Sequence, residues 1–284
     1  MNAARRALLS APFLLMRNAN AAAQSKFFRS SDGVRLHFAQ NGSGRMLVFV
    51  PGWCMPARIF APQIAHFQQN FSVIAFDPRG QGQSAIPAQG YEPERRGRDI
   101  ADLLDQLPPG RVVLAGWSLG VLDALSWLDM KGDSRLAGLV LIDNSVGEAD
   151  PPPPRASNFF SNLRTKREHT MRGFVRSMYR TPQDDAYLDA LTREAQRMPV
   201  EASIKLLSYP RPREFWRQAL YSSRRPVFYA VTPRLRTQAE AVAARHPAPT
   251  TSIYEDAGHA LFVDKADRFN AELLQFLNHK AVWT

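Results

Sequence analysis

A serine at the end of an apolar run is the residue of this chain best placed for chemistry. Residues 116–120 read Gly-Trp-Ser-Leu-Gly, a G-x-S-x-G pattern that directly follows the apolar run 112–115. The glycines of such a strand-to-helix turn leave room beside a serine held in a strained backbone. Residues 121–128 are typical of a helix, whose N-terminal amides would point at the serine. The pattern predicts Ser118 as a nucleophile.

A serine hydroxyl attacks well only when a neighbouring imidazole takes its proton, so the chain should supply a histidine. His259 lies in residues 256–262, on the loop between the last expected strand and the last expected helix. In an open parallel sheet that loop emerges at the same edge as the serine turn, which makes His259 the predicted base. Solvated or structural roles are favoured for the other histidines, His37, His66, His169, His246 and His279.

Length and composition favour a single α/β domain with room for an inserted subdomain. The chain has 284 residues, 45% of them hydrophobic, and its one cysteine, Cys54, excludes an internal disulfide. The net charge is +10, and residues 151–225 hold 15 basic against 7 acidic residues. No RNA-binding signature, zinc-finger spacing or helix-turn-helix pattern accompanies this charge, so a nucleic-acid partner is not expected.

Residues 1–23 are predicted to be a signal peptide. Arg5 and Arg6 precede the apolar run 7–16, and small residues follow at 19–23. The segment resembles a bacterial twin-arginine export signal, which implies a periplasmic or secreted protein. The alternative is an amphipathic extension of a cytoplasmic protein. The apolar run is too short to span a bilayer, so no integral membrane segment is expected.

From residue 27 onward, strand patterns alternate with helical ones, which predicts a mostly parallel sheet covered on both faces. An opening hairpin is expected around the turn 31–33. Buried strands are expected at 46–50, 71–76, 111–115 and 136–142, and further strands at 226–231 and 250–254. Helices are expected at 62–69, 94–107, 237–245 and 266–277.

The alternation stops at four consecutive prolines, residues 151–154, which exclude a helix there. The sequence up to residue 225 is rich in arginine and helical in pattern. We therefore predict an inserted helical cap at 151–225, which divides the core into 24–150 and 226–284.

Together these motifs resemble the α/β-hydrolase superfamily, in its capped lipase, esterase and peroxidase-like branch, over residues 27–284. The similarity is carried by a D-x-R-G-x-G-x-S turn in 76–84, the elbow 116–120, the histidine loop 257–262 and the segment 50–53, which is similar to the H-G-x loop. The resemblance implies an α/β-hydrolase fold with an eight-stranded, mostly parallel sheet, helices on both faces and a helical cap.

The resemblance also implies an oxyanion hole. Its donors would be the backbone N–H groups of Trp53 and Leu119, each worth on the order of 3 kcal/mol. Pro51 stands where the family usually has histidine, which need not matter to a hole made of backbone amides. The elbow sequence resembles carboxylesterases that cleave methyl esters of carrier-bound dicarboxylates, although Val121 replaces their next glycine.

The acid that orients the histidine departs from the family pattern. Most relatives have G-x-x-D after the strand expected here at 226–231, but this chain has Thr232 for the glycine and Leu235 for the aspartate. No carboxylate occurs between residue 226 and Glu240. The usual acid is therefore missing.

Asp143 ends the apolar run 139–142, the strand after the elbow, where haloalkane dehalogenases place their acid. The order Ser118, Asp143, His259 also agrees with that of the family, so Asp143 is interpreted as the acid. In other relatives an aspartate here only shapes the loop. Glu148, Asp150 and Glu240 are the alternative acids, whereas Asp256 and Asp264 are interpreted as loop and cap residues.

These residues predict a serine hydrolase that cleaves carboxylic esters through an acyl-enzyme. The alternatives are a non-catalytic binding or sensing homologue, motivated by Leu235, and a cofactor-free perhydrolase or acyltransferase. Dehalogenase chemistry is excluded because it needs an aspartate at the position of Ser118. No metal-ligand spacing is present, so neither metal nor cofactor is expected. The sequence indicates neither the substrate nor the oligomeric state.

Two features of the cap bear on the substrate. A basic series is either a solvated surface or a site that captures an acidic ester substrate or partner. An aromatic series is either core packing or the lining of an acyl pocket. The basic series is Arg155, Arg164, Lys166, Arg167, Arg172, Arg176 and Arg180, and the aromatic series is Phe159, Phe160, Phe174, Tyr179 and Trp216.

Overall fold

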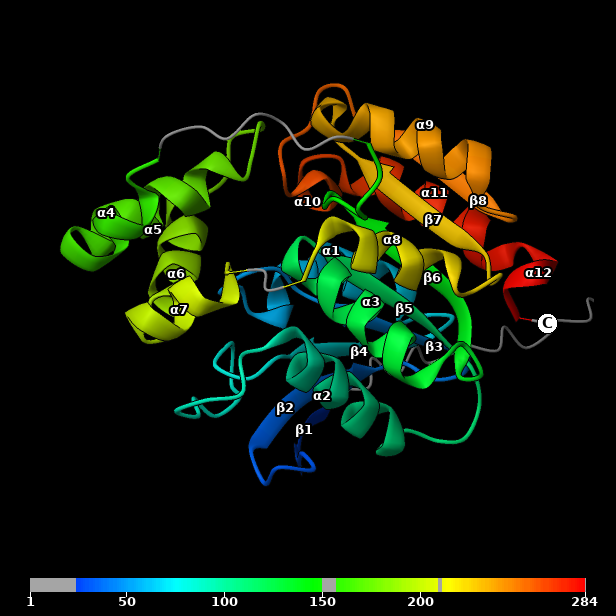
Figure 1. Ribbon diagram of the computed structural model, residues 1–284, viewed down its shortest axis with the longest axis horizontal. Helices are drawn as coiled ribbons and strands as arrows, with labels where there is room; N and C mark the ends of the chain where they lie inside the picture. Colours follow the sequence, from blue (N-terminus) through cyan, green and yellow to red (C-terminus); the bar gives the residue numbers. More distant parts are fainter. Residues whose placement is uncertain (1–23, 150–156, 209–210, 284) are drawn as a thin grey trace, which may run out of the picture.

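Eight strands form one sheet in the order β1-β2-β4-β3-β5-β6-β7-β8 (Figure 1). The computed structural model describes residues 24–149, 157–208 and 211–283. The predicted signal peptide 1–23 and the prolines 151–154 lie outside these ranges. The strands are β1 (Gln24–Arg29), β2 (Arg35–Asn41), β3 (Met46–Val50), β4 (Ser72–Asp77), β5 (Val112–Trp117), β6 (Leu136–Ile142), β7 (Val227–Val231) and β8 (Pro249–Ile253).

Strand β2 alone runs in the direction opposite to the other seven strands. It pairs antiparallel with β1 and β4, and every other pairing in the sheet is parallel. The central strands β3 to β7 are buried along their whole length, as expected for parallel strands covered on both faces. The predicted α/β-hydrolase fold with its opening hairpin is confirmed.

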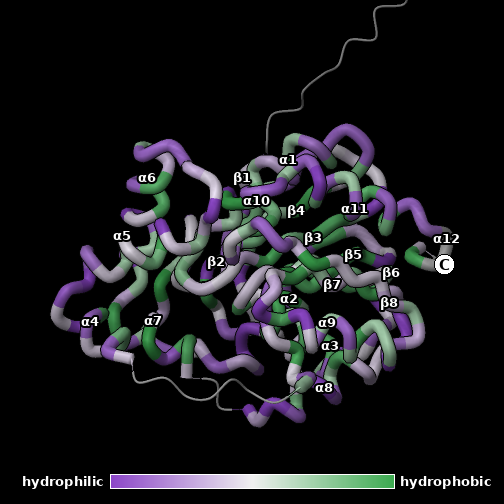
Figure 2. Tube along the Cα trace, turned by 90° about the horizontal axis from the view of Figure 1, so that it is seen from above, coloured by the Kyte–Doolittle hydropathy of each residue, from purple (hydrophilic) through white to green (hydrophobic). Residues whose placement is uncertain are grey.

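Helices cover the sheet on both faces. Viewed from above, α1 and α11 lie on one side of the strands and α2, α3, α8 and α9 on the other (Figure 2). None of the helices among the described residues is long and apolar enough to cross a membrane. The helices are α1 (Ala61–Phe67), α2 (Pro93–Asp105), α3 (Leu119–Lys131), α4 (Phe159–Thr165), α5 (Arg167–Ser177), α6 (Asp185–Ala195), α7 (Val200–Leu206), α8 (Arg213–Tyr221), α9 (Arg236–Arg245), α10 (Leu261–Asp264), α11 (Ala266–Asn278) and α12 (Lys280–Trp283), with 3-10 turns at η1 (Ala57–Phe60) and η2 (Pro233–Leu235).

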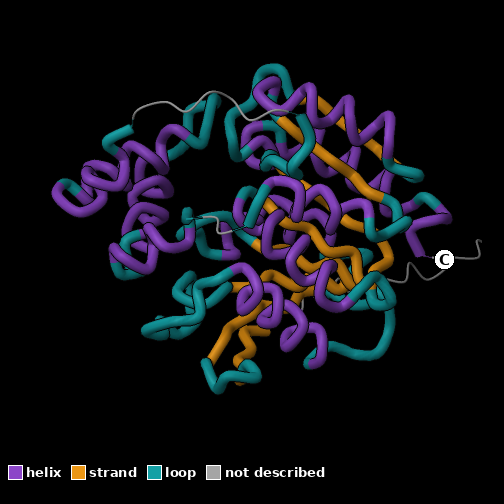
Figure 3. Tube along the Cα trace, viewed as in Figure 1, coloured by secondary structure: helices purple, strands orange, loops and turns teal. Residues whose placement is uncertain are grey.

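Helices α4 to α7 form a separate helical layer at one end of the sheet, which corresponds to the inserted cap (Figure 3). Helix α8, which the sequence assigned to the cap 151–225, instead packs against α3 on the face of the sheet. Its buried residues Trp216, Ala219 and Leu220 belong to the same apolar core as the strands. The helical pattern of 151–225 as a whole carried no information on which layer each of its helices joins.

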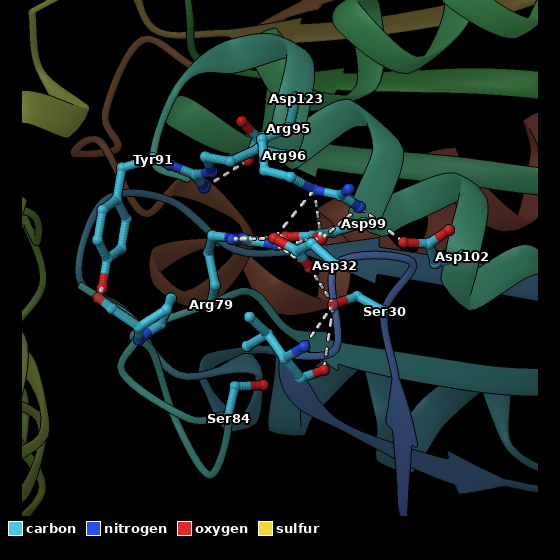
Figure 4. A network of polar contacts seen from close by, with 12 residues as sticks. Ser30, Asp32, Arg79, Ser84, Tyr91, Arg95, Arg96, Asp99, Asp102 and Asp123 are labelled. Carbon is cyan, nitrogen blue, oxygen red and sulfur yellow. Dashed lines mark hydrogen bonds and ion pairs between the residues drawn. The ribbon is translucent and has the colours of Figure 1, made fainter. Parts of the chain in front are cut away.

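The D-x-R-G-x-G-x-S turn, residues 77–84, is fixed to the core by a buried arginine. Arg79 donates to both oxygens of Asp99 on α2, at 2.5 and 2.6 Å, and to Asp32 in the opening hairpin at 3.1 Å (Figure 4). The Arg79 side chain is fully buried and Asp99 nearly so. This bidentate pair ties the turn, α2 and the hairpin together.

We expect Arg79→Met to lower the free energy of unfolding by as much as about 3–5 kcal/mol, because it removes the buried cation shared by Asp99 and Asp32 and leaves Asp99 only its bonds to Arg95. Urea denaturation would measure the change. The matched control Arg98→Met removes an exposed arginine of helix α2, and should change stability by less than about 0.5 kcal/mol. An equal effect of both variants would contradict the structural role of Arg79.

Candidate active site

Ser118 occupies the turn between β5 and α3 with a strained backbone. Its φ of 53° and ψ of −122° lie where non-glycine residues are rare, at a cost of about 1–3 kcal/mol. The neighbouring glycines permit the turn. A Cβ on Gly116 would lie 2.3 Å from the carbonyl oxygen of Gly120, and a Cβ on Gly120 would lie 2.3 Å from that of Val50. The spacing of the two glycines is thus required by backbone contact.

The carboxyl ends of three neighbouring strands are joined by backbone hydrogen bonds at this edge. The Ser118 N–H donates to the carbonyl of Ile142 at the end of β6, at 2.9 Å. The Asp143 N–H donates to the carbonyl of Ala230 in β7, also at 2.9 Å. The parallel pairing therefore continues just past β5 and β6, and sets Ser118 and Asp143 on adjacent strand ends.

The structure brings Ser118, His259 and Asp143 together. His259 Nδ1 lies 2.7 Å from Asp143 Oδ2, and His259 Nε2 lies 2.9 Å from Ser118 Oγ. An ionised carboxylate only accepts hydrogen bonds, so Nδ1 carries the ring proton and donates it to Asp143. The lone pair of Nε2 is then free to accept the Ser118 hydroxyl proton, as general-base chemistry requires.

Thr232 holds the other oxygen of the Asp143 carboxylate. Its N–H and its hydroxyl both donate to Asp143 Oδ1, at 2.8 and 2.7 Å. Burial alone would raise the pKa of Asp143, but the hydrogen bonds from His259 and Thr232 and the charge of His259 together hold that pKa below its usual range. The threonine that replaces the family glycine thus supports the carboxylate.

The alternative acids lie elsewhere or lie outside the described residues. Glu148 pairs with Arg245 at 2.8 Å, and Glu240 is exposed on α9. Asp150 lies outside the described residues. Leu235, at the position of the usual family acid, is buried in the 3-10 turn η2. Among the described candidates Asp143, Glu148 and Glu240, the structure connects only Asp143 to His259.

Two contacts that the sequence pattern did not reveal hold the histidine loop. The indole N–H of Trp117, inside the elbow, donates to the His259 carbonyl at 2.9 Å. Asp264 accepts from the N–H of Gly258 at 2.7 Å and from the N–H of Arg180 in the cap at 2.8 Å. The aromatic type of Trp117 and the position of Asp264 after the loop were the available signals, but neither specifies a partner.

Trp53 and Leu119, expected to form the oxyanion hole, flank Ser118. A Cβ on Gly52 would lie 2.8 Å from Ser118 Cβ, so the loop carrying Trp53 touches the serine. Gln81 donates to the Gly52 carbonyl at 3.0 Å, and because the peptide is trans, the Trp53 N–H points the opposite way. The N–H of Leu119, at the first position of α3, has no acceptor within the helix.

The cap contacts this loop directly. The Trp53 indole donates to the carbonyl of Ser203 in α7 at 2.7 Å. Its ring packs against Phe159 and Phe174 of the cap, with centroids 5.7 and 4.9 Å away. Part of the aromatic series thus packs against the loop that carries Trp53.

An open cavity of about 510 Å³ lies on the side of His259. It separates α5 of the cap from the loops that follow β7 and β8. Its lining includes His259, Asp143, Phe174, Met178, Thr232 and Arg234.

The basic series of the cap is largely paired within the protein. Arg164 pairs with Glu201, Arg172 with Asp189, and Arg176 with Asp185. Furthermore, Arg167 donates to the Met198 carbonyl and Arg180 to that of Glu255, while Arg155 lies outside the described residues. These contacts favour a solvated, ion-paired surface over a site that captures acidic partners.

A serine, a histidine and an aspartate also meet at a second place in the structure. His37 Nδ1 lies 2.8 Å from Asp77 Oδ2, and its Nε2 lies 2.9 Å from Ser25 Oγ. Ser25, however, lies in the regular strand β1, and Asp77 also accepts from the N–H groups of Ala57 and Gln83. Ser25 has neither a strained turn nor a helix N-terminus beside it. We therefore interpret this cluster as a structural link between the hairpin and β4.

The described residues contain no group of three or more His, Cys, Asp or Glu side chains arranged to hold a metal ion.

A sequence profile described as "Alpha/beta hydrolase family" matches residues 47–272. The chain belongs to the alpha/beta hydrolase family. The matched region runs from β3 to α11, and so contains Ser118, Asp143 and His259.

Relatives of this alpha/beta hydrolase cover more limited regions. The 2-(acetamidomethylene)succinate hydrolase of Mesorhizobium japonicum is 33% identical over 93 residues, 33% of this chain and 34% of that protein. A non-heme haloperoxidase of Rhodococcus erythropolis is 32% identical over 117 residues, 41% of this chain and 43% of that one. These alignments thus span about a third to two fifths of the curated relatives' own lengths.

Structural similarity extends over nearly the whole chain. A solved esterase from Exiguobacterium antarcticum superposes on this alpha/beta hydrolase with a TM-score of 0.80, covering 89% of this chain and 99% of the esterase. The two sequences are 20% identical, so the similarity concerns the fold.

The lowered pKa of Asp143 predicts an acid-dependent loss of stability. The folded-state pKa lies below the unfolded value of about 4, so ionised Asp143 contributes stability above that value and loses it as the pH falls through the folded pKa. Between pH 5 and 3 the free energy of unfolding should fall less steeply for Asp143→Asn than for wild type, as measured by urea denaturation. The control Ser118→Ala keeps the carboxylate and should retain the wild-type slope. Equal slopes for wild type and Asp143→Asn would refute this linkage.

Proposed function

We propose that this protein is a serine hydrolase that cleaves carboxylic esters through an acyl-enzyme. Ser118 is the nucleophile, His259 the general base and acid, and Asp143 the residue that orients the imidazole. The observation that carries the proposal is the continuous chain of hydrogen bonds from the Asp143 carboxylate through His259 to Ser118 Oγ. Family membership supports it independently.

In the first step Ser118 Oγ attacks the ester carbonyl and its proton passes to His259 Nε2. The negative charge that develops on the carbonyl oxygen is bound by the N–H groups of Trp53 and Leu119. Collapse of the tetrahedral intermediate breaks the ester C–O bond, and His259 returns the proton to the leaving alcohol. Water, deprotonated by the same nitrogen, then attacks the acyl-enzyme and releases the acid and free Ser118.

The non-catalytic alternative rested on the missing acid at Leu235. Asp143 lies at hydrogen-bond distance from the nitrogen that the usual acid would contact, which favours a working site. A perhydrolase or acyltransferase would use the same residues, because peroxide or an alcohol replaces water in the second step. The similarity to a haloperoxidase supports this alternative, in which a molecule other than water accepts the acyl group.

Export through residues 1–23 remains a proposal based on Arg5, Arg6 and the apolar run after them.

Fluorophosphonate labelling tests the nucleophile. An activated serine attacks this reagent, so wild type should form one adduct, located at Ser118 by peptide mass spectrometry, and Ser118→Ala should form none. The control Ser25→Ala removes the serine of the second Ser-His-Asp cluster and should label like wild type. No adduct under conditions that label a control esterase, or an adduct at Ser25, would exclude the proposed nucleophile.

Asp143→Asn tests the acid. The amide cannot hold the imidazole in the required tautomer, and the equivalent change in a serine protease costs on the order of 10⁴ in kcat. We expect a similar loss in hydrolysis of a p-nitrophenyl ester. The control Glu240→Gln changes an exposed alternative acid and should keep kcat within about threefold of wild type. A kcat for Asp143→Asn within roughly threefold of wild type would remove Asp143 from this role.

A further inference from the structure

Another cavity, of about 190 Å³, is lined by Leu119 of the elbow and not by His259. Leu119 and Leu122 of α3 form one wall, and Tyr91 and Leu206 contribute further apolar surface. The end of α7 and the start of α2 complete its lining, joined there by an ion pair between Lys205 and Glu92 at 2.7 Å. At its base lie the side chains of Arg96 and Asp123.

Arg96 lines this cavity, and it has hydrogen-bond donors that no described residue uses. Its side chain is 3% exposed, and its Nη2 donates to Asp123 Oδ2. Its Nε and Nη1 have no hydrogen-bond partner among the described atoms. Figure 4 shows Arg96 between Tyr91 and Asp123, apart from the Arg79 network. Buried donors left unpaired cost about 1–3 kcal/mol or more, so these N–H groups indicate an acceptor that the protein itself does not provide.

The charge at the base of the cavity also favours an anion. Burial raises the pKa of Asp123 to about 7, against the opposing effect of the Arg96 charge. Near neutral pH a substantial fraction of Asp123 is therefore protonated. In those molecules the guanidinium charge has no counter-charge from Asp123, whereas arginine itself stays charged.

The position of the cavity fits the acyl part of an ester. His259 must protonate the leaving oxygen, so the alcohol lies towards His259 and the 510 Å³ cavity on its side. The acyl chain then extends away from His259, and Leu119, the residue after Ser118, lines the 190 Å³ cavity. Asp123, the partner of Arg96, lies five residues after Ser118 and hence about 7.5 Å further along the axis of α3. This short rise along α3 motivates the choice of short acyl chains for the test below.

We propose that Arg96 binds a carboxylate at the far end of the acyl chain, so that the substrates are monoesters of short dicarboxylic acids. This assignment rests on the proposed ester hydrolysis at Ser118. It makes Arg96 a specificity residue, since it contacts the substrate away from the reacting carbonyl.

Matched pairs of methyl esters test the assignment. Monomethyl glutarate and adipate carry a terminal carboxylate, whereas methyl pentanoate and hexanoate have neutral chains of the same carbon count. Wild type should have the higher kcat/KM for the acidic ester of each pair. Arg96→Met should lower the ratio of acidic to neutral kcat/KM by roughly 10- to 100-fold, the size of a lost hydrogen bond to a charged group.

The control Arg98→Met removes an equal charge from the exposed side of α2. It should leave the ratio within about threefold of wild type, because exposed charges act weakly at a distance in salt. An equal fall for both variants would mean that general surface charge, not Arg96, selects the acidic ester. A ratio unchanged in Arg96→Met would likewise overturn the assignment.

A binding measurement separates this assignment from the proposed activity. Isothermal titration of glutarate into wild type should give saturable binding, weakened roughly 10-fold or more in Arg96→Met and retained in Arg98→Met. Binding that depends on Arg96 without any ester turnover would support the anion site and contradict the hydrolase. Turnover of neutral esters without glutarate binding would support the hydrolase and contradict the anion site. Circular dichroism of each variant confirms that it is folded.

Discussion

The candidate site depends on backbone hydrogen bonds that continue the parallel sheet past the ends of β5 and β6. Because Ser118 and Asp143 each donate to the neighbouring strand, their separation is fixed by the spacing of strands. Both residues also have a positive φ, 53° and 44°, which the surrounding sheet must hold in place. The histidine loop lies outside this pairing, and it is secured separately by Trp117 and Asp264. The site thus combines two residues held by the sheet with one held by side chains.

Sequence patterns predicted the features that depend on chain direction and periodicity. The apolar runs defined the strands, and the rule that parallel strands end at one edge placed Ser118, Asp143 and His259 together there. The helical pattern of 151–225 included the segment that forms α8. It could not tell whether α8 joins the cap or the sheet, since either surface would bury the same apolar stripe.

Contacts between side chains distant along the chain could not be predicted in this way. Thr232 looked like the loss of a family glycine, yet it donates twice to Asp143, 89 residues away. The arginine-rich cap suggested an acidic partner, but Arg164 pairs with Glu201 on another helix. Such pairings depend on the crossing of helices and on rotamers, which a linear pattern does not encode. The second cluster at His37 shows the converse, because matching residue types alone do not define a reactive site.

The hydrogen bond from Trp53 to Ser203 has a consequence for how such a protein could change. Trp53, whose backbone amide we propose for the oxyanion hole, donates its indole N–H to the cap. A cap exchanged for that of a relative would bring different aromatic and carbonyl partners, and the amide would shift with the indole. The cap helices that contact Trp53, α4, α5 and α7, must therefore vary together with the loop beneath them.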